Sequence, residues 1–125
     1  DGAHNPAGMS MLSHTLQEDF SSYRIILVLG VLKDKDVKTM VSTIIPISDV
    51  VIVTRSENPR AADPQVLKET IEEFDSKKTI VVEDTVARAV DHAKRIAKQK
   101  DMICVSGSLF TVGEARTYVL SRDKI

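Results

Sequence analysis

The opening residues of this chain combine the side chains best suited to chemistry near neutral pH. Asp1 supplies a carboxylate, and His4 supplies an imidazole whose charge changes in that range. Asn5 and Pro6, which follow, are residue types preferred at the N-cap and the first position of a helix. This spacing predicts that Asp1 and His4 lie at a helix N-terminus, where outward-pointing N–H groups bind phosphates and carboxylates readily. The alternative is a capped surface helix with an unused histidine.

A second set of polar residues is suited to binding carboxylates. Lys33 and Lys35 offer ammonium groups, and the fork-shaped guanidinium of Arg60 can hold a carboxylate in a bidentate manner. Ser108 offers a hydroxyl group together with the backbone N–H groups of the turn around it. Each residue has a structural alternative: a solvated helix start for the lysines, a loop-fixing salt bridge for Arg60 and a helix cap for Ser108.

The elements that position these residues follow from short apolar runs, which are typical of strands covered on both faces. The runs are Arg24–Val31, Asp49–Thr54, Thr79–Glu83 and Met102–Ser106. Helical patterns start after Asn5, Asp36, Asp63 and Thr85, and a last helix is predicted over Val112–Leu120. Strands that alternate with helices predict a parallel sheet with helices on both faces. Ligands of such sheets bind beyond the carboxyl ends of the strands, where Lys35, Arg60 and Ser108 are expected.

Length and charge restrict the class of protein. The chain of 125 residues has the length of one domain, with 17 Lys plus Arg against 18 Asp plus Glu. This balance gives no field that would attract nucleic acid or an anionic membrane, and no apolar run approaches the roughly 20 residues of a membrane span. The single cysteine, Cys104, lies in an apolar run and is predicted to be a buried structural thiol. These features predict a cytoplasmic protein without nucleic-acid or membrane partners.

Four stretches of the sequence, in this order, resemble the C-terminal domain of folylpolyglutamate and dihydrofolate synthases, which belong to the Mur-ligase family. They are Asp1–Pro6, Gly30–Asp36, Thr54 with Asn58–Ala61, and Gly107–Phe110 with Gly113-Glu114. The family's phosphate loop, G-x-x-x-x-G-K-[ST], does not occur in the sequence, and neither do the metal ligands of its central domain. The resemblance therefore implies that residues 1–125 form a single C-terminal, glutamate-binding domain of a larger ligase.

The fold implied by the resemblance is α/β: a three-layer Rossmann-like domain with a parallel sheet of four strands and helices on both faces. The family's sheet has six strands, of which two would lie upstream of Asp1. The implied spatial order is Met102–Ser106, Arg24–Val31, Asp49–Thr54 and Thr79–Glu83. The edge formed by Met102–Ser106 is expected to be bare or to contact another chain.

The activity implied by the resemblance is an ATP-dependent ligation. ATP would convert the γ-carboxylate of a reduced folate to an acyl phosphate, which the amine of L-glutamate then attacks. The family motifs assign Asp1 and His4 to ATP, with His4 also stabilising charge in catalysis. They assign L-glutamate to Lys35, Arg60 and Ser108. ATP and Mg²⁺ would serve the complete enzyme together with its N-terminal ATPase domain, whereas this fragment is expected to bind neither tightly and to be inactive alone.

Two other functions stay open at this point. One is a non-catalytic α/β module that binds a small anion or nucleotide, although the sequence lacks the cluster of strand-end acids that a phosphoacceptor site needs. The other is the C-terminal domain of a different Mur-type amide ligase. The runs Lys33–Asp36 and Asn58–Ala61 favour the folate branch, with or without dihydrofolate synthesis as a second activity.

Overall fold

Four parallel strands form the central layer of the computed structural model, which describes residues 3–122. The strands are β1 (Arg24–Leu29), β2 (Val50–Val53), β3 (Ile80–Val82) and β4 (Asp101–Ser106). They pair in the order β3-β2-β1-β4, with Val28 of β1 opposite both Ile52 of β2 and Val105 of β4. The predicted parallel sheet and its strand order are therefore confirmed, and β4 forms an edge of the sheet within the described residues.

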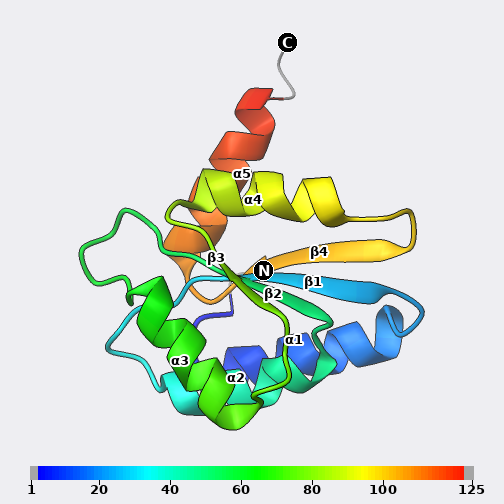
Figure 1. The fold of residues 1–125 in the computed structure, drawn as a ribbon, viewed down its shortest axis with the longest axis horizontal. Coiled ribbons are helices and arrows are strands. Elements are labelled where there is room, and N and C mark those ends of the chain that lie inside the picture. Colours follow the sequence, from blue (N-terminus) through cyan, green and yellow to red (C-terminus); the bar gives the residue numbers. More distant parts are fainter. Residues whose placement is uncertain (1–2, 123–125) are drawn as a thin grey trace.

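Helices cover both faces of this sheet (Figure 1). One face packs against α1 (Pro6–Asp19), α2 (Val37–Ile44) and α3 (Pro64–Phe74), and the opposite face against α4 (Val86–Ile96) and α5 (Leu109–Arg122). A short 3₁₀ turn, η1 (Ile45–Ile47), links α2 to β2. The three-layer α/β architecture is thus the one that the sequence predicts.

The helices begin where capping residues predict. The side chain of Asn5 accepts a hydrogen bond from the Gly8 N–H at 2.8 Å, and Asp36 accepts one from the Thr39 N–H at 3.3 Å. Asp63 and Thr85 cap α3 and α4 in the same way. The last helix differs from the prediction: it begins at Leu109 rather than Val112, because Ser108 caps it.

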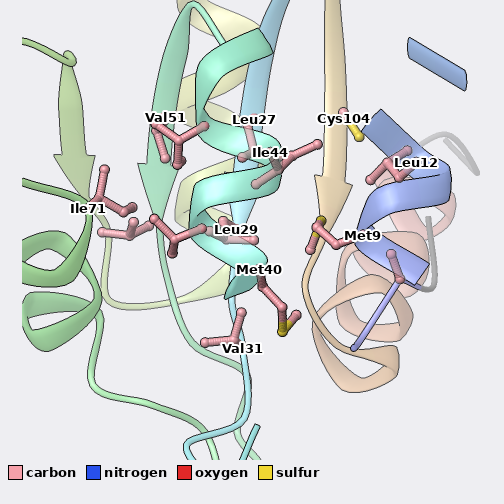
Figure 2. Packing of buried hydrophobic residues seen from close by; sticks show 14 of the residues in the cluster. Met9, Leu12, Leu27, Leu29, Val31, Met40, Ile44, Val51, Ile71 and Cys104 are labelled. Carbon is pink, nitrogen blue, oxygen red and sulfur yellow. The ribbon is translucent and has the colours of Figure 1, made fainter. Parts of the chain in front are cut away.

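The core surrounds β1, whose residues from Ile25 to Leu29 are all buried because both faces of the strand are covered. Leu27 and Leu29 point toward Met9, Met40 and Ile44 of α1 and α2 (Figure 2). Their neighbours Ile26 and Val28 pack against Ala89 and Ala93, whose small size lets α4 approach the sheet. Burying each such strand side chain stabilises the fold by about 1.5–3 kcal/mol, so β1 fixes the register of the strands beside it.

Two residues outside the strand-end motifs illustrate what sequence patterns do and do not predict. Cys104 is 8% exposed, and burial raises the pKa of its thiol, as expected of a structural cysteine. His92, which no sequence motif singles out, is also largely covered: its Nδ1 lies 2.7 Å from the Glu83 carboxylate, and only 23% of the side chain is exposed. No helix in residues 3–122 is long and apolar enough to cross a membrane.

Candidate functional site

The carboxyl ends of β1, β2 and β4 meet the segment before α1 at one edge of the sheet. Backbone hydrogen bonds join these segments: the Gly30 N–H donates to the Ser106 carbonyl at 3.2 Å, and the Gly107 N–H donates to the Ala3 carbonyl at 3.0 Å. The Ala62 N–H donates to the Val31 carbonyl at 2.9 Å. Segments that are far apart in the sequence, and that carry the predicted site residues, are therefore brought together here.

His4 lies at this edge because its neighbour Ala3 is tied to the end of β4. The Ala3 carbonyl accepts hydrogen bonds from the Gly107 N–H and, at 3.4 Å, from the Ser106 hydroxyl. His4 itself is partly exposed and lines a hollow of about 350 Å³ with the first turns of α1. Asp1, the other residue predicted to bind ATP, lies outside the described residues.

Two glycines let these segments approach closely. Gly107 has φ +114°, a conformation that side chains strongly disfavour, and a Cβ there would collide with the Gly30 carbonyl. A Cβ on Gly30 would lie 2.7 Å from the Thr111 hydroxyl oxygen. Only glycine at both positions allows β1, the turn after β4 and the start of α5 to touch.

Ser108 is 1% exposed, and its hydroxyl is engaged inside the protein. The Ser108 Oγ accepts a hydrogen bond from the Thr111 N–H at 3.0 Å and donates one to the Thr111 Oγ1 at 2.9 Å. Thr111 in turn donates to the Gly30 carbonyl at 3.0 Å. The helix cap, which was the structural alternative for Ser108, is thus formed, and a carboxylate at this helix start would meet backbone N–H groups.

The loop after β1 and the loop after β2 form a second, charged part of the site. The Lys33 N–H donates to the Arg60 carbonyl at 2.8 Å, and Leu32 forms an isolated bridge with Ala61. The Arg60 guanidinium pairs with the Asp34 carboxylate, with 52% and 50% of the two side chains exposed. The hydrogen bond from Arg60 lowers the pKa of Asp34 below its ordinary value. The loop-fixing salt bridge foreseen for Arg60 is therefore present.

Lys35 differs from Arg60 because its ammonium group forms no ion pair in the described part of the chain. Its backbone is fixed, since the Lys35 N–H donates to the Leu32 carbonyl at 3.3 Å and its carbonyl accepts from the Val37 N–H at 2.9 Å. Within residues 3–122, no hydrogen bond or ion pair engages its ammonium group. A partly exposed cation on a fixed backbone can bind an external carboxylate.

Thr54 directly follows β2, and its N–H donates to the Leu29 carbonyl at 2.9 Å. The residue is fully buried, yet its hydroxyl has no hydrogen-bond partner in the described part of the chain. Thr54 and Thr111 thus place two buried hydroxyls at the same sheet edge, one unpaired and one fully bonded. Sequence reasoning did not single out Thr111, although Ser108-x-x-Thr111 has the spacing of a helix cap and its partner.

A larger groove, of about 760 Å³, lies on the α4–α5 side of this edge and was not predicted. Among its lining residues are Arg55, Asp84 and Glu114, together with the exposed apolar side chains of Leu109 and Phe110. The Glu114 carboxylate accepts a hydrogen bond from the Glu57 N–H at 2.8 Å, which fixes the loop after β2 against α5. His4, Lys35, Arg60 and Ser108 do not line this groove.

Metal-ligating side chains do not form a cluster in the described residues. Within residues 3–122, no three His, Cys, Asp or Glu side chains gather closely enough to hold a metal ion. The arrangement that is present consists of a partly exposed imidazole, a free ammonium group, an exposed guanidinium and the N-terminus of α5. Such a set can bind and orient anionic groups.

Comparison with known proteins identifies the family. The family model described as "Mur ligase, glutamate ligase domain" matches residues 1–109. The dihydrofolate synthase/folylpolyglutamate synthase of Mycobacterium tuberculosis is 33% identical over 136 residues, covering 98% of this chain and 28% of the relative. The UDP-N-acetylmuramoyl-L-alanyl-D-glutamate–2,6-diaminopimelate ligase of Clostridium botulinum is 36% identical over 111 residues, covering 86% of this chain and 22% of the relative.

Solved structures agree with this result. The folylpolyglutamate synthase of Mycobacterium tuberculosis in complex with ADP superimposes with a TM-score of 0.87 and 33% identity, over 94% of this chain and 28% of that chain. The present chain thus spans less than a third of the length of these relatives. Because the family model and the superposition cover nearly all of it, the chain belongs to the Mur-ligase family and corresponds to the C-terminal domain of folylpolyglutamate and dihydrofolate synthases.

Proposed function

We propose that this chain is the single, glutamate-binding C-terminal domain of a cytoplasmic ATP-dependent ligase that adds L-glutamate to the γ-carboxylate of a folate. The observation that carries the proposal is the meeting of the motif segments at one sheet edge, through the Gly107–Ala3 and Lys33–Arg60 backbone hydrogen bonds. That edge combines cations with a helix N-terminus, as binding of an anionic amino acid requires. Family membership supports ligation as the reaction.

In the proposed reaction, the folate carboxylate takes the γ-phosphoryl group of ATP and becomes an acyl phosphate. The glutamate amine then attacks the acyl carbon, an amide bond forms, and inorganic phosphate leaves. Phosphoryl transfer of this kind depends on positioning and on positive charge near the transferring oxygens. We assign Asp1 and His4 to the nucleotide, with His4 stabilising charge near the phosphates. Residues 3–122 contain no cluster of three His, Cys, Asp or Glu side chains for a metal on the phosphates, and we derive no step through such a metal.

L-Glutamate carries two carboxylates, and in the charged part of the site we assign them to Lys35 and Arg60. Among residues 3–122, the Lys35 ammonium has no ion-pair partner that a ligand would need to displace. The Arg60 guanidinium is bound to Asp34, but both side chains are about half exposed, so a ligand carboxylate can replace Asp34 at small cost. The N-terminus of α5, capped by Ser108, adds backbone N–H groups. These contacts would orient the amine toward the acyl phosphate.

The location of the amino-acid site can be tested on this chain directly. Titration of the ¹⁵N-labelled chain with L-glutamate should shift the amide signals of residues 33–36, Arg60 and residues 108–110. Lys35→Ala should weaken these shifts, whereas Lys38→Ala, a change at an exposed lysine of α2, should not. Shifts confined to the groove around Asp84 and Glu114, or shifts that persist in Lys35→Ala, would contradict the proposed site.

The chain alone should bind ATP weakly and should not turn it over. This domain would form only one wall of the ATP site and so provide only part of the contacts to ATP. We therefore expect a dissociation constant in the millimolar range, which corresponds to a binding free energy of about −4 kcal/mol. Isothermal titration calorimetry and an ADP-release assay measure these properties. Magnesium-dependent turnover by the purified chain, unchanged by further purification and abolished by His4→Ala, would show that the chain is more than one part of a ligase site.

A second candidate function is supported by the relative from Clostridium botulinum, whose identity to this chain, 36%, is similar to that of the folate-branch relative. In that case the amino acid bound at Lys35 and Arg60 would be 2,6-diaminopimelate. Competition decides between the two: diaminopimelate displacing L-glutamate in the titration above at a tenfold lower concentration would favour the second candidate.

A further inference from the structure

Thr111 occupies an unusual place in the site, although it reaches no solvent. The residue lies in the first turn of α5 and is 1% exposed. Its hydroxyl oxygen accepts a hydrogen bond from Ser108 at 2.9 Å and donates one to the Gly30 carbonyl at 3.0 Å. The latter bond joins positions separated by 81 residues in the sequence. Thr111 thus connects the cap of α5 to the end of β1.

The two groups that bond to the Thr111 hydroxyl, the Gly30 carbonyl and the Ser108 hydroxyl, lie next to the segments that carry the predicted site residues. Gly30 directly precedes the buried residues Val31 and Leu32, and the loop with Lys35 follows them. On the other side, the turn that Ser108 caps contains Gly107, whose N–H binds the Ala3 carbonyl next to His4. Thr111 is therefore connected through hydrogen bonds both to the strand end that leads into residues 33–36, here called the lysine loop, and to the segment that carries His4.

We propose that Thr111 is a positioning residue that sets the lysine loop and the His4 segment in one geometry, an inference that rests on the proposed function for its effect on substrates. Because Thr111 is buried, it acts only through Gly30 and Ser108. Without its hydroxyl, the Gly30 carbonyl and the Ser108 O–H lose their partner and the two segments can shift independently.

The helix itself is held by other contacts, so the hydroxyl is not needed merely to dock α5. Ala115 of α5 is 5% exposed and packs in a cluster with Val86 and Val90 of α4. The Tyr118 hydroxyl donates a hydrogen bond to the Asp91 carboxylate of α4 at 2.7 Å. These contacts lie on the side of α5 that faces α4, whereas the Thr111 hydroxyl faces β1.

The test uses Thr111→Val, which keeps the shape of the side chain, Thr111→Ser, which keeps the hydroxyl, and Ser48→Ala as a matched control. Ser48 is 2% exposed and donates to the Ile44 carbonyl at 2.8 Å, but it lies just before β2, at the opposite end of the sheet. In a complete ligase that carries this domain, Thr111→Val should raise the KM for both ATP and L-glutamate about five- to tenfold. Thr111→Ser should stay within twofold of the wild type, and so should Ser48→Ala.

Hydrogen exchange on this chain separates failure of the inference from failure of the proposed function. Thr111→Val should speed exchange of the Gly107 and Lys33 amides together, while Ser48→Ala leaves both unchanged. If these amides are unaffected in Thr111→Val, the inference is wrong whatever the enzyme does. If they respond but the wild-type enzyme ligates no amino acid, the coupling holds and the proposed function fails. Unchanged KM values in Thr111→Val in an active enzyme would also overturn the positioning role.

Discussion

The two parts of the candidate site use their polar groups in opposite ways. In the buried part, formed by Ala3, Gly30, Gly107, Ser108 and Thr111, hydroxyls and backbone groups bond to one another, and no charged side chain takes part. In the charged part, formed by Lys33, Asp34, Lys35 and Arg60, the Arg60–Asp34 pair is about half exposed. The first part therefore sets geometry and the second presents charge, so substitutions in the two should have different effects.

The largest expected effect in the buried part is that of Gly107→Ala. A side chain at φ +114° is strained and would collide with the Gly30 carbonyl, so the free energy of unfolding should fall by about 2–4 kcal/mol. Gly113→Ala is the matched control, because a Cβ there meets nothing within 4 Å. Inside α5, that change should stabilise the chain by about 0.5–1 kcal/mol. Urea denaturation measures both, and equal effects of the two substitutions would mean that the close approach at Gly107 is absent.

A sharper comparison within the buried part uses its two buried threonines. Thr111→Val leaves the Gly30 carbonyl and the Ser108 O–H unpaired, which should cost about 1–3 kcal/mol of stability. Thr54→Val removes a hydroxyl that has no partner among residues 3–122, so it should be neutral or stabilise by about 1 kcal/mol. Thermal unfolding of the two variants gives the comparison. A clear loss of stability in Thr54→Val would show that its hydroxyl binds a group, such as a buried water, that the described residues do not include.

The smallest expected effect concerns the Arg60–Asp34 pair and appears as a pH dependence. Because Arg60 lowers the pKa of Asp34 below its ordinary value of 3.8, the pair contributes to stability above that pH. The contribution is lost as the pH falls below 3.8 through the pKa of the folded state. Arg60→Gln should return the Asp34 pKa toward 3.8, as NMR titration of its carboxyl carbon can measure, with little change in stability at pH 7. An Asp34 pKa that is the same in both proteins would mean that the ion pair does not form in solution.

The same contrast explains what the sequence could predict. Caps such as Asn5 and Asp36 act over three residues, and branched runs such as Ile25–Leu29 mark buried strands, so local patterns predicted these elements. The strand order came from the family resemblance, because periodicity does not specify which strands pair. Side-chain contacts between separate elements were missed, among them the Thr111–Gly30 bond and the pairing of His92 with Glu83.

For the candidate site, the sequence predicted which residue types lie at strand ends, but not whether their side chains are paired or buried. Whether Arg60 is free or bound to Asp34 depends on how two loops fold against each other, which the backbone contact between Lys33 and Arg60 decides. Likewise, Ser108 is identifiable as a polar residue after a strand, but its burial depends on the contact between the first turn of α5 and the residue that follows β1. The roles of His4, Lys35, Arg60 and Ser108 toward ligands stay predictions.

The most direct test of the central claim, that the charged part binds L-glutamate, is a pair of substrate titrations in a complete ligase that carries this domain. Lys35→Ala should raise the KM for L-glutamate about ten- to a hundredfold, the loss of one charge-assisted hydrogen bond of about 1.5–3 kcal/mol, and leave the KM for ATP unchanged. His4→Ala should raise the KM for ATP and leave the KM for L-glutamate unchanged. Lys38→Ala should change neither value. Normal glutamate dependence with a large ATP defect in Lys35→Ala would contradict the account and assign the lysine loop to the nucleotide.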